Sequence, residues 1–575
     1  MPNVLLRQAA RRLGARGTEP LRFFSRLPTV MLLAALLGTV FVVGRRFLGE
    51  TAAGLATIAC ALDPNLIANS SLATVDTAYA LATLLTLAAV LWLAERVSAP
   101  RGLALGAALG LAFAVKFTAF LLVPAVAVLP FLVPALRARL FRRATLGAAA
   151  VALAATLLVI AAAYGFHDLG AELNDVGWRS SEMTRLAARL PHLRLPVPAA
   201  FASGYDLLAV AVEKDYPVVL LGHRHPRGVW YYFPVHWALK TPVLLLAALV
   251  WGLGRVAVSG ALWRQPALSY LGLNLALALA WFSLCFATQV GFRFVLMCVP
   301  MAALVAAAGL APLVATRRGR VWLALVAAVS LAENAAYLGN HLAFTSAAVW
   351  PKREAFRLVT NSNVDWGQND EKIGGWLAEA GLGAAARDPV HALPGDDVFD
   401  LNQLAGVGKF RQHLWLREHL SPRAHFGHTY LWFTVDAALY ERLLDEDRHL
   451  RTGPDEARLC EGATPSAPVA DGAWAAIPEL ARTEALMLCV AVPARADLGL
   501  FADEGTIVLG PAREPLRDQP LMRPGQQSWY RLEPGTSALA VTWATAFRGH
   551  WALRGGPAAL ATRRVAVEAG TLSLP

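Results

Sequence analysis

Apolar runs separated by short polar loops fill residues 28–339, whereas residues 340–575 have the mixed pattern of a soluble protein. Runs of about 17 to 25 apolar residues are typical of helices that cross a membrane. We predict ten spans, of which the fourth is short and forms either a separate helix or a broken or tightly hairpinned pair with the fifth. The predicted spans are 28–44, 51–67, 77–95, 102–115, 117–135, 145–165, 235–253, 267–286, 293–314 and 321–339.

The same pattern divides the chain into four regions. Residues 1–27 carry six arginines and predict a basic amphipathic helix on the membrane surface. Residues 28–339 form a transmembrane domain with a long outer loop at 166–234. Residues 340–460 alternate between helical and strand patterns, which predicts an α/β domain. Residues 461–575 contain short alternating runs, which are typical of a β-rich module.

The composition supports a membrane protein. Hydrophobic residues make up 56% of the 575 residues and charged residues only 16%, whereas soluble domains carry about 25% charged residues. The predicted fold class is therefore a polytopic α-helical membrane protein of about ten spans, followed by a C-terminal mixed α/β and β-rich region.

The basic residues indicate which loops face the cytoplasm. Thirteen arginines lie in alternate short loops, whereas the intervening short loops hold only Lys116 and Arg293. The positive-inside rule places the arginine-rich loops in the cytoplasm. These arginines are Arg45, Arg46, Arg96, Arg101, Arg137, Arg139, Arg142, Arg143, Arg255, Arg264, Arg317, Arg318 and Arg320.

The other loops then lie outside the cytoplasmic (inner) membrane, together with the chain after the last span. The hinge that holds Asp76 and the loop 166–234 belong to this side. The net charge of +11 is explained by this topology, because the arginines lie between apolar runs. We therefore predict membrane lipids, and no nucleic acid, among the partners.

The sequence offers little for a metal or a disulfide. His223 and His225 form a pair on a loop, but a zinc site needs more ligands than two. We predict no metal site. Cys460 and Cys489 both fall in the predicted outer region, where a disulfide can form, and both the paired and the free state remain open.

Four charged residues fall on the predicted outer side, within or beside apolar sequence. They are Asp76, Lys116, Lys240 and Arg293. A carboxylate at the mouth of a membrane helix costs desolvation energy unless it has a partner or a function. One carboxylate and three cations suit an anionic, membrane-borne substrate such as a lipid phosphate, with the carboxylate accepting a proton.

Structural alternatives remain open for each of these residues. Lys116 and Lys240 can extend to the lipid headgroups, and Arg293 can anchor its span at the interface. Asp76 can cap the helix that follows it. The aromatic run 230–233 is either an interface belt or a platform on which a sugar stacks.

Five sequence landmarks, in order, resemble those of bacterial family 39 glycosyltransferases, relatives of the protein O-mannosyltransferases. The last landmark is the most specific, because it is similar to the family's Ser-Asn-Leu-Asp-Trp-Gly-Gln just after the final span. Together they cover residues 28 to about 435. They are Asp63-Pro64-Asn65-Leu66-Ile67-Ala68 with Thr74-Val75-Asp76, Gly106 with Gly110-Leu111 and Lys116-Phe117-Thr118, Trp230-Tyr231-Tyr232-Phe233 with Leu239-Lys240-Thr241-Pro242, Gly291-Phe292-Arg293-Phe294 with Pro300, and Ser362-Asn363-Val364-Asp365-Trp366-Gly367-Gln368.

The resemblance implies a C-type glycosyltransferase. Such an enzyme passes a sugar from a polyprenyl phosphate to a hydroxyl of a protein, glycan or lipid acceptor at the outer face, and the lipid-linked sugar takes the place of a cofactor. Asp76 is the implied catalytic carboxylate. Lys240 and Arg293 are candidates for the phosphate, and Asp365 with Gln368 forms either an acceptor contact or a structural junction. The substrate-binding candidates are Lys116, Tyr232, Lys240, Arg293, Asp365 and Gln368.

The chain departs from the family pattern in three places. The acidic pair of the family, usually Asp followed by Glu in the first outer loop, has no counterpart here. We therefore expect the first span and first outer loop to be missing. Asn69 stands where relatives often have His, and Asn361 stands where they often have Asp. The alternative function is that of a catalytically inactive relative that acts as a lipid-binding or partner subunit.

Overall fold

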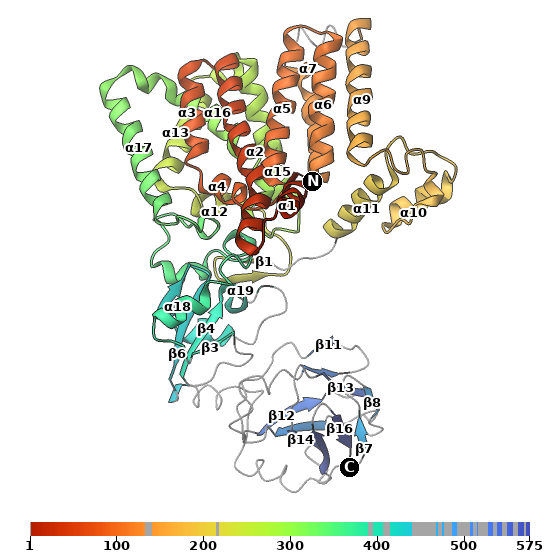
Figure 1. Ribbon diagram of the computed structural model, residues 1–575, viewed down its shortest axis with the longest axis vertical. Coiled ribbons are helices and arrows are strands. Elements are labelled where there is room, and N and C mark those ends of the chain that lie inside the picture. Colours follow the sequence, from red (N-terminus) through yellow and green to blue (C-terminus); the bar gives the residue numbers. More distant parts are fainter. Residues whose placement is uncertain are drawn as a thin grey trace. The chain divides into compact units, whose positions relative to one another are not determined.

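The computed structural model of the chain has two compact units (Figure 1). The first consists of Met1–Trp350 and Asn361–Val364, and the second of Pro351–Thr360 and Asp365–Pro575. The structure describes residues 2–132, 141–213, 218–383, 385–388, 395–405, 407, 414–436 and 438–439, together with strands between 467 and 574.

The first unit is almost entirely helical. Its elements are α1 (Pro2–Arg12), α2 (Thr18–Phe47), α3 (Glu50–Ala61), α4 (Pro64–Ser70), α5 (Asp76–Glu95), α6 (Ala99–Val115), η1 (Phe117–Leu121), α7 (Leu122–Leu132), α9 (Arg143–Ala163), η2 (Leu173–Asp175), α10 (Ser181–Arg189), α11 (Ala199–Glu213), β1 (Val218–Leu220), β2 (His223–His225), α12 (Tyr232–Leu239), α13 (Val243–Val258), α14 (Ala261–Arg264), α15 (Pro266–Leu284), η3 (Phe292–Val295), α16 (Cys298–Leu310), η4 (Ala311–Ala315), α17 (Arg317–Ala335), η5 (His341–Ala343) and η7 (Asn361–Asn363).

Several of these helices are membrane spans by length and composition, which confirms the predicted fold class. Within the described residues, α2, α5, α9, α15 and α16 with η4 are long and apolar enough to cross a membrane. The pair α3 and α4, bent by 62°, counts as a sixth if it forms one span. Most of each predicted apolar run, as far as the structure describes it, lies on a helix or a pair of helices. However, α6 and α13 are shorter than a full span.

The N-terminal region differs in its boundary from the prediction of one surface helix over 1–27. Helix α1 ends at Arg12, and α2 begins at Thr18 and continues without a break through the first predicted span. Pro28 lies inside α2.

Helix α16 lies at the centre of the first unit. Most of its side chains are buried, and it packs against α3, α13 and α15 (Figure 1). Helices α6 and α9 are in close contact, because Gly106 faces the Ala152 carbonyl with no room for a side chain. Small residues at such a crossing are the usual way in which membrane helices come into close contact.

The second unit contains a four-stranded sheet in the order β3-β4-β6-β5. Strand β3 is parallel to β4, and the remaining pairs are antiparallel, with Asp400 opposite Tyr430. A small core of Ile373, Leu377 and Val398 joins α18 to this sheet. The elements are η6 (Lys352–Arg357), α18 (Ile373–Glu379), β3 (Ala386–Arg387), β4 (Gly395–Asp400), α19 (Leu401–Leu404), α20 (Leu414–His419), β5 (Ala424–Phe426) and β6 (Tyr430–Val435).

Beyond residue 461 the described elements are strands, in two antiparallel sheets of order β11-β10-β13-β8 and β12-β9-β14-β15-β16-β7. Cys489 lies on β9, but Cys460 and both side chains are outside the described residues, so the pairing of these cysteines stays open. The strands are β7 (Ala467–Val469), β8 (Trp474–Ala476), β9 (Leu486–Ala491), β10 (Thr506–Leu509), β11 (Glu514–Pro515), β12 (Gln527–Leu532), β13 (Ala538–Thr542), β14 (Gly549–Gly555), β15 (Thr562–Glu568) and β16 (Thr571–Leu574).

Candidate functional site

Asp76 and Lys116 form a buried ion pair. Asp76 is the first residue of α5, with its side chain 3% exposed, and Lys116 follows α6 with its side chain 15% exposed. The distance from Nζ of Lys116 to Oδ1 of Asp76 is 2.6 Å. Since each charge offsets the desolvation of the other, both can lie at the end of a membrane helix.

A break in the helix directs Lys116 toward Asp76. Helix α6 ends at Val115, and Lys116 has an extended backbone with φ −154° and ψ 130° before η1 begins at Phe117. The chain therefore breaks at Lys116, between the fourth and fifth predicted spans. Because Lys116 lies between two helices, its side chain extends from the break to Asp76.

The ring of Phe294 brings Arg293 into the same site. The Nζ atom of Lys116 lies 5.0 Å from the ring centroid of Phe294, and Cζ of Arg293 lies 5.2 Å from that ring. Lys116 is also 5.5 Å from the ring of Tyr79, one turn after Asp76. Such cation–π contacts hold positive charge in an apolar setting. The structure thus places Asp76, Lys116 and Arg293 together.

Asp76 does not cap its helix through its side chain. The N-cap position of α5 is occupied by Val75, and no side chain there bonds to the first turn. The capping carboxylate of this hinge is Asp63, whose Oδ1 accepts from the backbone N–H groups of Asn65 and Leu66, both at 2.9 Å. The capping alternative for Asp76 is therefore wrong, which leaves its carboxylate for the pair with Lys116.

Lys240 occupies a different environment from Lys116. It is 3% exposed, and its ammonium donates to the carbonyl oxygens of Leu342 and Phe344, each at 2.9 Å, and of Asn363. An ammonium has three protons to donate, so these carbonyls use its full capacity. The geometry favours a structural role for Lys240 over the predicted contact with a phosphate, and it likewise excludes the snorkelling alternative.

Tyr232 is also part of the interior. It is 1% exposed, and its hydroxyl accepts a hydrogen bond from Nδ2 of Asn363 at 2.9 Å. A sugar cannot stack on a ring in this position without a rearrangement of the unit. The geometry therefore does not favour the predicted substrate contact of Tyr232.

Asn363 organises this region, and sequence reasoning assigned it no role. Its Oδ1 accepts from the backbone N–H of Phe292 at 2.7 Å, its Nδ2 lies 3.0 Å from Nε2 of His236, and its carbonyl accepts from Lys240. Phe292 begins η3, which carries Arg293. Asn363 therefore fixes the position of Arg293. Its position in the most specific landmark was the sequence signal that could have identified it.

Asp365 and Gln368 form a turn in the second unit. Oδ1 of Asp365 accepts from the Gly367 N–H at 3.1 Å, and Oε1 of Gln368 accepts from the Trp366 N–H at 2.7 Å. Gly367 has φ +72°, which favours glycine. These bonds favour the structural-junction alternative for both residues.

A network of carboxyl groups surrounds Asp365. Burial raises the pKa of Asp365, and burial together with the neighbouring Asp365 raises the pKa of Asp400. The hydrogen bond between the two lowers the pKa of Asp365 and raises that of Asp400. Burial also raises the pKa of Asp388 to about 6, and Oδ1 of Asp388 accepts from the Asp400 N–H.

The part of the chain that the structure describes contains no group of three or more His, Cys, Asp or Glu side chains that could hold a metal ion. His223 and His225 lie on β2 and remain a pair. Nε2 of His225 lies 3.5 Å from the Tyr231 hydroxyl.

Known proteins resemble parts of this chain. Residues 12–162 match the family model for dolichyl-phosphate-mannose-protein mannosyltransferases. Comparison with curated proteins gives no match.

Three solved structures are similar in fold to a limited degree. ArnT from Cupriavidus metallidurans in the apo state is 16% identical with a TM-score of 0.35, and the match covers 54% of this chain and 48% of that one. ArnT bound to undecaprenyl phosphate is 15% identical with a TM-score of 0.38, covering 59% and 54%. The chain thus spans about half the length of the ArnT structures.

The third structure is archaeal oligosaccharyltransferase AglB from Archaeoglobus fulgidus, in complex with an inhibitory peptide and a dolichol-phosphate. It is 11% identical with a TM-score of 0.40, covering 98% of this chain and 88% of that one. Asp76 and Lys116 both lie in the segment 12–162, and over that segment the resemblance to the protein mannosyltransferase family is confirmed.

Proposed function

We propose that this protein transfers a sugar from a polyprenyl-phosphate donor to a hydroxyl acceptor at the outer face of the cytoplasmic membrane. The observation that carries the proposal is the buried pair of Asp76 and Lys116 beside Arg293. The family match over residues 12–162 supports it, because it includes both members of the pair.

The chemistry assigns a role to each charge. The acceptor oxygen forms a bond to the anomeric carbon of the sugar, and the bond from that carbon to the phosphate oxygen breaks. Asp76 accepts the proton of the acceptor hydroxyl as general base. Lys116 and Arg293 offset the negative charge that develops on the departing polyprenyl phosphate.

The ion pair also suggests how the base becomes available. The carboxylate of Asp76 accepts a hydrogen bond from Lys116 at 2.6 Å. A phosphate group close to Arg293 attracts the ammonium of Lys116 away from the carboxylate. Binding of the donor thereby frees Asp76 to accept a proton, and proton transfer is coupled to the presence of the lipid phosphate.

An apolar cavity beside α5, two helical turns beyond Asp76, supports a lipid-borne donor. It has a volume of about 170 Å³ and is lined by Thr83 and Leu87 of α5, Leu122 of α7, and Trp281 of α15, among others. Thr83 lies seven residues after Asp76, which is about two helical turns on the same face. Hydrocarbon attached to a phosphate at Asp76 can therefore extend into the interior of the unit.

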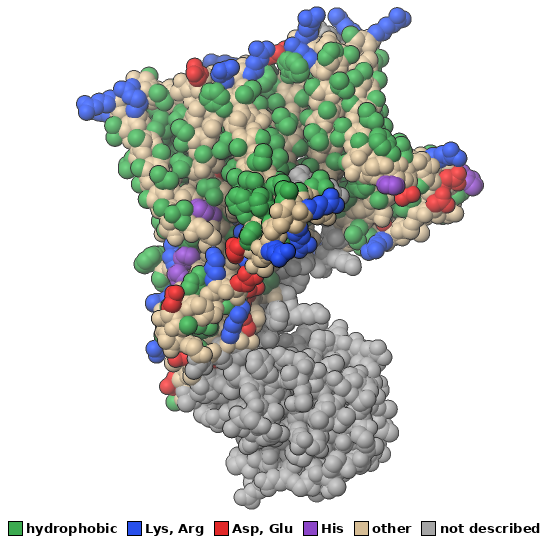
Figure 2. Space-filling view, in the orientation of Figure 1, with side chains coloured by type: hydrophobic (Ala, Val, Ile, Leu, Met, Phe, Trp, Pro, Cys, Tyr) green, Lys and Arg blue, Asp and Glu red, His purple; other side chains and the backbone are tan. Residues whose placement is uncertain are grey.

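The distribution of charge supports the assignment of sides. Lys and Arg side chains gather at the end of the helical unit that lies at the top of Figure 2. Arg46 and Arg101 bind Glu95 at the last turn of α5, whereas Asp76 is at its first turn. The positive-inside rule then assigns Asp76 to the outer face and the arginine end to the cytoplasm.

The test uses the purified full chain with a polyprenyl-phosphate-linked sugar and a hydroxyl acceptor. Asp76→Asn is expected to lower sugar transfer at least about 100-fold, the usual contribution of a general base, while donor binding persists. Glu182→Gln changes an exposed carboxylate of α10 and serves as the matched control. Unchanged turnover in Asp76→Asn would contradict the assignment. Donor binding without transfer in the unmodified chain would favour the alternative, a lipid-binding partner subunit.

A further inference from the structure

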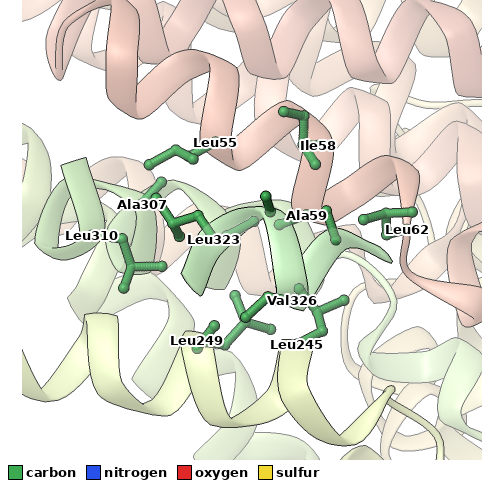
Figure 3. Close-up of a pocket in the computed structure, with 14 residues that line it drawn as sticks. Leu55, Ile58, Ala59, Leu62, Leu245, Leu249, Ala307, Leu310, Leu323 and Val326 are labelled. Carbon is green, nitrogen blue, oxygen red and sulfur yellow. The ribbon is translucent and has the colours of Figure 1, made fainter. Parts of the chain in front are cut away.

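The cavities of the helical unit differ in the charge at their openings. One, of about 210 Å³, lies between α3, α13, α16 and α17 and is lined by aliphatic side chains. Figure 3 shows Leu55 and Ile58 on one side of this cavity and Leu245 and Leu249 on the other. No charged side chain is among its described lining residues, so nothing there selects a headgroup.

A second cavity, between α2, α5 and α6, has both an apolar interior and a charged mouth. Its volume is about 480 Å³, within the range of about 300 to 1,000 Å³ that is usual for pockets that hold a ligand. Alanines at 88, 89, 104 and 108 leave this space between the helices, and Phe47 and Trp92 line it near the arginine end. The cavity lies beside the membrane-spanning helices α2 and α5, and its lining is mostly apolar. A hydrocarbon chain is therefore the occupant that suits it.

Arg46, which lines the mouth, shares one carboxylate with the neighbouring Arg101. Glu95 binds Arg46 at 2.7 Å and Arg101 at 3.6 Å. The Arg46 side chain remains 59% exposed, and Cζ of Arg101 lies 4.8 Å from the Trp92 ring. Arg45 and Arg96 adjoin this group in the sequence, and Glu50 is the other acidic residue of these loops. The mouth therefore carries an excess of positive charge.

We propose that the groove between α2, α5 and α6 is a binding site for an anionic glycerophospholipid. An acyl chain lies along the alanines of α5 and α6, and the phosphate contacts Arg46 and Arg101. A lipid with a zwitterionic headgroup fills the apolar part equally well but carries a positive group that these arginines repel. The arginines thus supply selectivity for anionic lipid.

This site is separate from the proposed donor site. Helix α5 has 20 residues, with Asp76 at its start and Trp92 near its end, and a helix of this length spans about 30 Å. That is about the thickness of the hydrocarbon core of a bilayer. The two sites consequently face opposite leaflets, and the lipid at the arginine end does not compete with a donor at Asp76.

The test measures lipid retention by the full chain in detergent micelles, using native mass spectrometry. Phosphatidylglycerol and phosphatidylcholine with identical acyl chains are titrated separately. We expect tighter binding of phosphatidylglycerol. Arg46→Gln is expected to weaken it by about fivefold and to leave phosphatidylcholine unchanged. Arg255→Gln, which changes an exposed arginine of α13 outside the groove, is the matched control and should leave both lipids unaffected.

A second variant tests the groove itself. Ala104→Phe places a ring in the apolar part without a change of charge and should lower the retention of both lipids. Equal affinity for the two lipids in the unmodified protein overturns the proposal. An equal loss of phosphatidylglycerol binding in Arg46→Gln and Arg255→Gln also overturns it. General attraction of the lipid to the arginine end would then account for the binding.

Discussion

The ammonium of Lys116 lies 2.6 Å from the carboxylate of Asp76, although 40 positions separate them in the chain. This pair joins the start of α5 to the break after α6, and both partners are shielded from water. Removal of one partner leaves the other as a buried charge, whereas removal of both leaves none. A comparison of single and double variants therefore separates the effect of the pair on stability from its effect on the proposed chemistry.

Lys116→Gln is expected to lower the free energy of unfolding by about 3 kcal/mol, the lower end for a broken buried ion pair. The double variant Asp76→Asn with Lys116→Gln should regain most of this stability because no charge remains buried. Thermal unfolding in detergent gives the stabilities, and the transfer assay should find both variants inactive. Equal stability of the single and double variants would show that the pair contributes little.

Lys240→Met is expected to destabilise the first unit by a few kcal/mol, because three buried carbonyls lose their donor. The donor affinity of the fraction that remains folded should be unchanged. Polyprenyl-phosphate binding, measured on protein that has passed size-exclusion chromatography, tests this. A loss of donor affinity in fully folded protein would restore the predicted phosphate contact of Lys240.

Gly106→Ala is expected to destabilise the contact of α6 with α9, since the added Cβ would lie 2.1 Å from the Ala152 carbonyl oxygen. Gly147→Ala on α9 is the matched control, because nothing lies within 4 Å of its added Cβ. We expect a clearly lower melting temperature for the first variant and an equal or higher one for the second. Similar melting temperatures would mean that the two helices can separate at little cost.

The stability of the second unit is expected to fall as pH rises above the ordinary carboxyl range of about 4. The pKa of Asp400 is raised in the folded state by burial and by Asp365. Between its unfolded and folded pKa the native state therefore binds more protons than the unfolded state, and a rise in pH favours unfolding. Asp370, Asp388 and Arg387 are the other charged groups of this network.

Asp400→Asn should flatten this dependence and keep the helix cap of α19, since an amide oxygen can still accept from the Asn402 N–H. Hydrogen exchange of peptides across residues 395–405 at pH 6 and pH 8 gives the measurement. Asp396→Asn is the control, because hydrogen bonds from Thr434 and Trp432 lower the pKa of Asp396 below this window. An unaltered pH slope in Asp400→Asn would assign the titration to another group.

Hydropathy was sufficient to predict where the helices lie, since most of each predicted apolar run is helical among the residues that the structure describes. The boundary that it gave between the runs 102–115 and 117–135 coincides with the break at Lys116. It could not distinguish Lys116 from Lys240, since both are single lysines in apolar surroundings. The two lysines differ in their tertiary contacts, because the carbonyls that bind Lys240 belong to residues 102 to 123 positions away in the sequence.

The contribution of Asn363 to the first unit has a consequence for biosynthesis. Residues 361–364 belong to the membrane unit although ten residues of the second unit precede them. While the ribosome has not yet passed residue 363, Lys240 lacks one of its carbonyl partners and the Phe292 N–H lacks its acceptor. The helices can therefore insert into the bilayer before the site is complete. The contacts of Lys240 and Phe292 form only after residues 361–364 have been synthesised and have packed against the helices.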